Sequence, residues 1–111
     1  MPRLMVRYKV RPDQAAANVQ AIESVFTELW EQSPPGVRYA TFTLDDGVTF
    51  VHLFSGETEH DRAALQALPA FKAFSSAVRD RCEEQPVVTP LNDVGSYRMF
   101  GEASPSEPFV R

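Results

Sequence analysis

The sequence has 111 residues, a single cysteine, 43% hydrophobic residues and a formal net charge of −4 at pH 7. This length corresponds to one domain, and the single cysteine excludes an internal disulfide and a cysteine-rich zinc site. The acidic balance argues against a nucleic-acid partner, and no apolar run approaches the ~20 residues that span a bilayer. The charged N-terminal stretch does not fit a signal peptide, so we expect a cytoplasmic protein without a membrane partner.

The first half of the chain predicts a strand, a helix and a hairpin. Residues 3–10 alternate, with Leu4, Val6, Tyr8 and Val10 on one face, as in a strand with one buried side. Pro12 then opens a helix whose apolar side chains recur at helical spacing at positions 15, 19, 22, 26 and 29. The segment "SPPG" stops this helix, and residues 37–44 and 48–54 read as antiparallel strands joined by "DDG".

The second half predicts a helix pair and a last strand. Thr58 and Asp61 resemble a capping box before a short helix over about 60–68. Pro69 begins a second helix with the stripe Phe71, Phe74, Val78 and Cys82. An extended segment follows from 87 to about 100, with a bulge expected at Gly95.

This order of elements predicts the fold class. It indicates an α+β, ferredoxin-like βαββ(αα)β sandwich, in which helices cover one face of a four-stranded antiparallel sheet. We expect one ferredoxin-like domain over residues 1–100 and a loose C-terminal tail over 101–111.

The strand predicted at 48–54 is apolar on both faces, which calls for cover on both sides. The predicted helices cover only one side of the sheet, and the chain is too short to supply another layer. An uncovered apolar face is typical of an interface. We therefore expect a two-fold homodimer, in which the segment 94–100, "VGSYRMF", pairs with the partner's second strand.

The candidate site is expected on the sheet face that points away from the helices. Compact Val51 and Leu53 suit helix packing, whereas the bulkier side chains of the same strand suit a cavity. Small-molecule pockets are mostly apolar, with a few fixed polar groups. The set predicted for this face fits that description: Arg7, Lys9, Tyr39, Phe50, His52 and Phe54.

Each polar or aromatic candidate has a functional and a structural interpretation. His52 could act as a general base at neutral pH, or it could be a half-buried histidine paired with a neighbour. Arg7 could hold an anionic substrate, or it could pair with an acid across the dimer. Tyr39 and Tyr97 could orient a ligand, or they could contribute only packing.

Three segments carry a resemblance to a known family: "VRYKVRPD", "GVRYATFTLDDGVTFVHLF" and "LPAFKAFSSAVRDRC". From residue 3 to about residue 100 the chain resembles the dimeric α+β barrel superfamily, and within it the antibiotic-biosynthesis-monooxygenase-like group, chiefly its uncharacterised bacterial members. The resemblance implies a homodimer with facing sheets and a pocket between sheet and helices or in the barrel lumen. The family includes cofactor-free oxygenases of aromatic polyketides, haem-degrading enzymes and cyclases with a tyrosine–histidine pair.

Residues and resemblance together predict a small-molecule enzyme that resembles the cofactor-free monooxygenases. It would act on an aromatic or polyketide-like substrate, with His52 as the catalytic base and no metal or cofactor. The alternatives are a non-catalytic dimeric domain for ligand binding or accessory roles, and a polyketide cyclase or isomerase that uses Tyr39 and His52 without oxygen.

Overall fold

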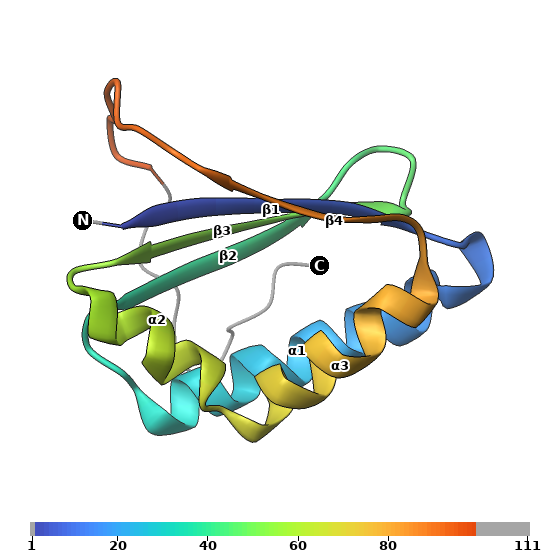
Figure 1. The fold of residues 1–111 in the computed structure, drawn as a ribbon, viewed down its shortest axis with the longest axis horizontal. Helices are drawn as coiled ribbons and strands as arrows, with labels where there is room; N and C mark the ends of the chain where they lie inside the picture. The colour runs from blue at the N-terminus through green and yellow to red at the C-terminus, as the bar shows by residue number, and fades with distance from the viewer. Residues whose placement is uncertain (1, 100–111) are drawn as a thin grey trace.

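A computed structural model describes residues 2–99 and contains a four-stranded antiparallel sheet with three α-helices on one side (Figure 1). The elements are β1 (Arg3–Val10), α1 (Ala15–Gln32), β2 (Val37–Thr43), β3 (Thr49–Gly56), α2 (Glu59–Gln66), α3 (Pro69–Arg81) and β4 (Cys82–Pro90). The strands lie in the order β2-β3-β1-β4. This is the predicted ferredoxin-like α+β sandwich. None of the helices in residues 2–99 combines the length and apolar character needed to cross a bilayer.

Local sequence signals set the helix boundaries. Pro12 begins a short 3-10 turn, Pro12–Gln14, that leads directly into α1. Ser33 ends α1 in the left-handed conformation, with φ of 47°. The capping box predicted for α2 is present, and the Asp61 carboxylate accepts a 2.8 Å hydrogen bond from the Thr58 backbone N–H. Pro69 occupies the first turn of α3, where its missing N–H leaves no helical hydrogen bond unmade.

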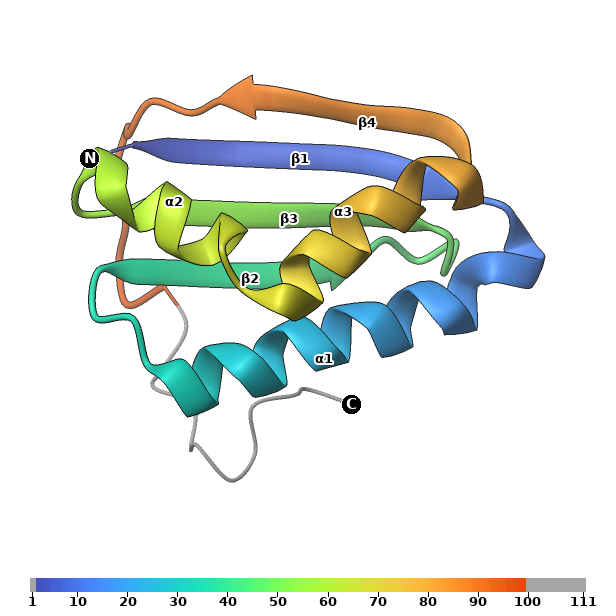
Figure 2. The ribbon, with the colours of Figure 1, turned by 60° about the horizontal axis from the view of Figure 1, so that its bottom comes forward.

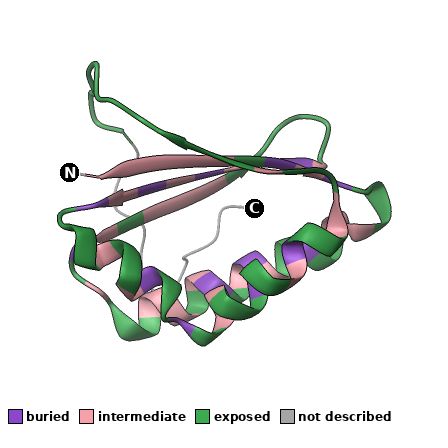
Figure 3. Cartoon of the chain, in the orientation of Figure 1, coloured by how far each residue is buried: buried purple, intermediate pink, exposed green. Residues whose placement is uncertain are grey.

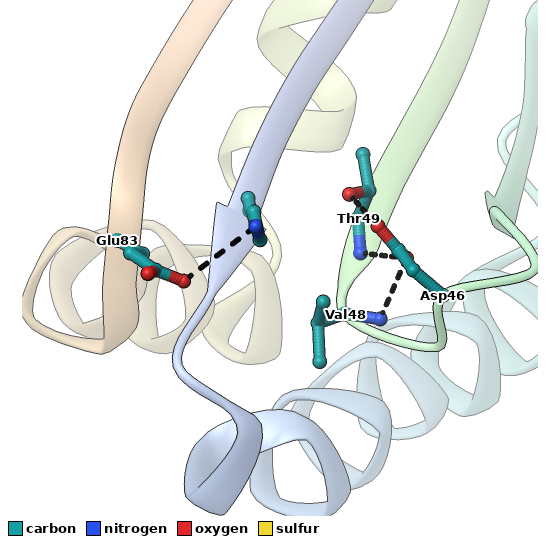
Figure 4. A network of polar contacts seen from close by, with 5 residues as sticks. Asp46, Val48, Thr49 and Glu83 are labelled. Atoms are coloured by element: carbon teal, nitrogen blue, oxygen red, sulfur yellow. Dashed lines mark hydrogen bonds and ion pairs between the residues drawn. The ribbon is translucent and has the colours of Figure 1, made fainter.

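The turn between β2 and β3 is held by Asp46. Its carboxylate accepts hydrogen bonds from the backbone N–H groups of Val48, at 3.0 Å, and Thr49, at 2.8 Å (Figure 4). A hydrogen bond from the Thr49 hydroxyl, and then these two backbone bonds, lower the pKa of Asp46. Gly47 adopts φ of 72°, a conformation that glycine reaches without a steric penalty. The turn therefore fixes the register in which Thr41 lies opposite His52.

The core lies between the sheet and the helices, which cover one face of the sheet (Figures 2 and 3). On α1 the buried positions are Asn18, Ile22 and Val25, whereas Val19 is 37% exposed. Ile22 is therefore buried as predicted, whereas Val19 is not, because the buried side of α1 contains Asn18 and Val25 instead. The buried apolar core consists of Tyr8, Val10, Ile22, Val25, Phe50, Phe54, Leu65, Leu68, Phe74 and Val78.

The last strand differs from its prediction. It begins at Cys82, where the backbone leaves the helix with ψ of 138°, and it ends at Pro90. Residues 87–90 are strand as predicted, whereas residues 91–99 form none, so the continuation of the strand beyond Pro90 and the bulge at Gly95 are wrong. The irregular pairing lies instead where β1 meets β4, between Arg7 and Val10. The end of the predicted strand, at residue 100, and the expected tail over 101–111 lie outside the described residues.

Candidate functional site

The prediction that Phe50, His52 and Phe54 point away from the helices is wrong. The register of β1 and β3 places Tyr8 opposite Phe50, and both side chains are almost fully buried under the helices. His52, two residues along β3, shares this helix side and is only 3% exposed. Arg7 lies opposite Val51 and is exposed, so it belongs to the other face of the sheet. That other face, here called the outer face, does not carry the site.

A cavity of about 300 Å³ lies between the sheet and helices α2 and α3. Tyr39, His52 and Phe54 line it, together with side chains from β1 and β4. Phe50 is 1% exposed in the core beside the cavity and does not line it. Tyr97 is 83% exposed after the end of β4, and the Arg98 guanidinium lies 5.3 Å from the centre of its ring. The lining is mostly aliphatic and aromatic: Leu4, Val6, Tyr8, Tyr39, Phe54, Leu65, Phe71, Phe74, Val78, Pro86 and Val88.

His52 lies on the sheet side of this cavity with both ring nitrogens in hydrogen bonds. Its Nε2 lies 2.8 Å from the Tyr8 hydroxyl. Its Nδ1 lies 2.6 Å from the Tyr39 hydroxyl and 3.1 Å from the Thr41 hydroxyl. The ring of Phe74, from α3, packs on the imidazole with a centroid separation of 5.4 Å. Tyr39 lies on the same side of the sheet as His52, as predicted, but that side faces the helices rather than pointing away from them, and Thr41 shares it.

The network continues from Tyr8 to two residues outside the sheet. Asn18, fully buried on α1, donates its Nδ2–H to the Tyr8 hydroxyl at 2.8 Å. The Asn18 Oδ1 accepts a 3.0 Å hydrogen bond from Nε of Arg81, the last residue of α3. The Arg81 guanidinium also lies over Phe74, 5.8 Å from the ring centre.

These contacts determine how the protons are arranged. A guanidinium only donates, so the Asn18 oxygen must face Arg81 and its NH₂ group must face Tyr8. The Tyr8 hydroxyl proton is then free to donate to Nε2 of His52. The arrangement that satisfies both ring nitrogens and the Tyr8 hydroxyl places the imidazole proton on Nδ1, where Tyr39 or Thr41 accepts it. The Tyr39 hydroxyl proton can then be donated either to the Thr41 hydroxyl or to a molecule in the cavity.

Burial controls the charge of these groups. Removal from water lowers the pKa of His52 to about 4, because the charged imidazolium loses its hydration. The same desolvation raises the pKa values of Tyr8 and Tyr39 above their ordinary value. At neutral pH the site therefore contains a neutral imidazole and two neutral phenols.

Four members of the network were not predicted as site residues: Tyr8, Asn18, Thr41 and Arg81. Asn18 did carry a usable signal, since positions 15, 18, 22, 25 and 29 also form a helical stripe, and a polar residue in such a stripe needs a buried partner. Arg81 carried none, because its contact with Asn18 spans 63 positions of the chain.

Comparisons with known proteins identify the fold. No family model matches the sequence, and no curated protein matches it. A crystal structure of an antibiotic biosynthesis monooxygenase is similar, with a TM-score of 0.72 and 14% identity, over 86% of this chain and 100% of the other. SnoaB from Streptomyces nogalater, a cofactor-independent oxygenase whose N63A mutant was crystallised, has a TM-score of 0.65 and 14% identity over 86% and 94%.

The chain has the fold of the antibiotic-biosynthesis-monooxygenase-like proteins. Sharing this monooxygenase-like fold does not assign an activity, because one fold hosts many functions. A protein of unknown function from Nitrosomonas europaea, NE2512, is equally similar, with a TM-score of 0.68 and 18% identity over 90% of this chain and 95% of that one. Within residues 2–99, no three histidine, cysteine, aspartate or glutamate side chains gather to hold a metal.

Proposed function

We propose that the protein is a small-molecule enzyme that oxidises an aromatic or polyketide-like substrate with dioxygen and without a cofactor. The observation that carries this proposal is the aromatic cavity of about 300 Å³ with the Tyr39–His52 pair on its wall. That volume is at the lower end of the range for small-molecule sites, and an apolar lining with few polar groups is typical of them. The monooxygenase-like fold agrees with this chemistry.

In the proposed reaction the Tyr39 hydroxyl donates a hydrogen bond to an oxygen of the substrate. This bond stabilises the enolate or phenolate that forms when the substrate loses a proton. His52 positions Tyr39 through its Nδ1–H and takes up a proton at Nε2 by way of the Tyr8 hydroxyl. The resulting electron-rich carbon reacts with dioxygen. Overall, a CH₂ group becomes a carbonyl, with one oxygen atom entering the product and the other leaving as water.

The low pKa of His52 constrains this chemistry. A neutral imidazole is the form that accepts a proton, but a pKa of about 4 makes it a weak base. An anion bound beside it would raise its pKa, because an opposite charge favours the imidazolium. The proposal therefore requires the substrate anion to stay in the cavity while His52 is charged.

Incorporation of labelled oxygen into the product tests the proposal directly. Purified protein treated with a metal chelator is given anthrone-type and other enolisable aromatic compounds under ¹⁸O₂. Turnover with one ¹⁸O atom in the product supports the proposal, and Tyr39→Phe should reduce the rate at least about a hundredfold, the lower end of the usual range for a lost proton-transfer or anion-stabilising group. Conversion that proceeds equally well without oxygen would favour a cyclase or isomerase instead.

A non-catalytic ligand-binding domain is the second candidate. The occupation of both His52 nitrogens by protein hydroxyl groups favours it, because neither nitrogen is free for a substrate. Compounds that bind in the cavity and are recovered unchanged under both atmospheres would support this alternative.

We further propose that the protein functions as a homodimer. The outer face of the sheet presents Phe42 and Leu44, each 37% exposed, and Val87, 62% exposed. The segment after β4 adds the exposed side chains of Val94 and Met99. Exposed apolar side chains on an uncovered sheet face are typical of interfaces. Light scattering across micromolar dilutions should report twice the monomer mass, and a monomer at every concentration would refute the dimer.

A further inference from the structure

Two arginines lie at the mouth of the cavity. Arg62 from α2 and Arg79 from α3 both line it, and both are exposed to solvent. On each helix the lining positions follow helical spacing: they are 62, 65 and 66 on α2, and 71, 74, 75, 78 and 79 on α3. This spacing of three and four residues places each arginine on the side of its helix that faces the cavity.

No carboxylate lies beside these arginines in the lining that residues 2–99 provide. Among those residues, the ones that line the cavity include neither aspartate nor glutamate, although the chain as a whole carries a formal charge of −4. Arg79 is held instead by the neutral amide of Gln85, which accepts from Nη1 at 3.4 Å and donates to the Arg79 carbonyl at 3.0 Å. Within residues 2–99, Arg62 has no ion pair, whereas Arg3 pairs with Asp93.

We propose that Arg62 and Arg79 select aromatic ligands that carry a carboxylate group. The proposal rests on the function proposed above, and it specifies the chemical class of the substrate. The aromatic part would occupy the apolar interior beside Tyr39 and Phe74, and the carboxylate would remain at the mouth. A guanidinium presents a planar fork of donors that matches a carboxylate, and a cleft of one charge sign with apolar walls concentrates the opposite charge.

The test compares two ligands of nearly equal shape, 2-naphthoate and 2-naphthamide, on the full-length protein. Affinities are measured by calorimetry, and the binding place is read from NMR shifts of the His52 and Phe74 rings. We expect naphthoate to bind about tenfold more tightly than naphthamide at low salt, as two partly exposed ion pairs would produce. Added salt should weaken only the naphthoate complex.

The variants Arg62→Gln and Arg79→Gln should each remove part of this preference, and the double variant should bring the two affinities to parity. Lys72→Gln is the matched control, since Lys72 is exposed on α3 without lining the cavity, and it should keep the wild-type preference. A preference that survives the double variant would overturn the role of the arginines.

The outcomes also separate this inference from the proposed function. Equal binding of both ligands beside His52 in the wild type would refute carboxylate selection and leave the proposed aromatic site standing. If neither ligand shifts the NMR signals of the His52 and Phe74 rings, the result would count against the aromatic site itself.

Discussion

The burial of a neutral His52 predicts a specific loss of stability in mild acid. The unfolded chain has an ordinary histidine pKa near 6.5, whereas burial lowers the folded-state pKa of His52 to about 4. Below pH 6.5 the unfolded state therefore binds a proton that the folded state does not. The contribution of His52 to stability is complete above pH 6.5 and is lost progressively as the pH falls towards 4.

The size of this loss follows from the gap between the two pKa values. At about 1.4 kcal/mol per pH unit, the full gap corresponds to about 3 kcal/mol, and about 2 kcal/mol of it is lost by pH 5. Urea unfolding of the wild type and of His52→Asn at pH 7.5 and pH 5 measures it. The wild type should lose about 2 kcal/mol more than the variant over this interval, because both share every other titratable group.

The second histidine supplies the control. His60 is exposed at the start of α2, and His60→Asn should keep the additional acid sensitivity that His52 produces. His52→Asn should itself cost about 1–3 kcal/mol at pH 7.5, since the two tyrosine hydroxyls lose a partner that bonds both of them. Equal pH dependence in the wild type and His52→Asn would refute the argument that burial keeps this imidazole neutral.

Three further predictions concern the network, the hairpin turn and the assembly. Asn18→Ala should lower the free energy of unfolding by about 2–4 kcal/mol in urea titrations, because it removes the acceptor of the Arg81 Nε–H and one of the two hydrogen bonds of the buried Tyr8 hydroxyl; a loss below about 1 kcal/mol would show that the network contributes little. Gly47→Ala should cost about 1–2 kcal/mol and lower the melting temperature by several degrees, because φ is 72° there although the space is open. Gly95→Ala, also in open space but without a positive φ, should melt like the wild type. Deletion from Ser96 onward should weaken the proposed homodimer, whereas deletion from residue 101 onward should not; equal light-scattering masses for the two truncations would remove 96–100 from the interface.

The sequence determined the order of the elements well, because each boundary has a local chemical cause. Pro12, the capping pair of Thr58 and Asp61, and Pro69 act within a few residues of where they stand. The hairpin was also accessible, since a turn held by Asp46 fixes which residues of β2 and β3 face the same side. That is why Tyr39 and His52 were correctly placed together.

The choice of face for this pair could not be made from local signals. β3 is apolar on both sides, so alternation does not distinguish them, and a shift of one residue in its pairing with β1 would exchange the faces. That register depends on contacts such as Val6 with His52, 46 positions apart in the chain. The size of the side chains in β3 did not indicate which face points away from the helices, because the cavity lies under the helices and accepts large rings there.

The hydrogen-bonded network draws its members from five separate elements, which makes the site a product of the finished fold. The β2–β3 hairpin alone supplies the hydrogen-bond partners of the imidazole Nδ1. The Nε2 atom gains its partner, Tyr8, only when β1 pairs with β3. The Tyr8 hydroxyl is oriented only when α1 and α3 have packed on the sheet. No fragment that stops before residue 81 can contain the complete arrangement. Ligand binding in the cavity should therefore disappear at the same denaturant concentration as the helical signal, so that function reports on the integrity of the whole domain rather than on one of its parts.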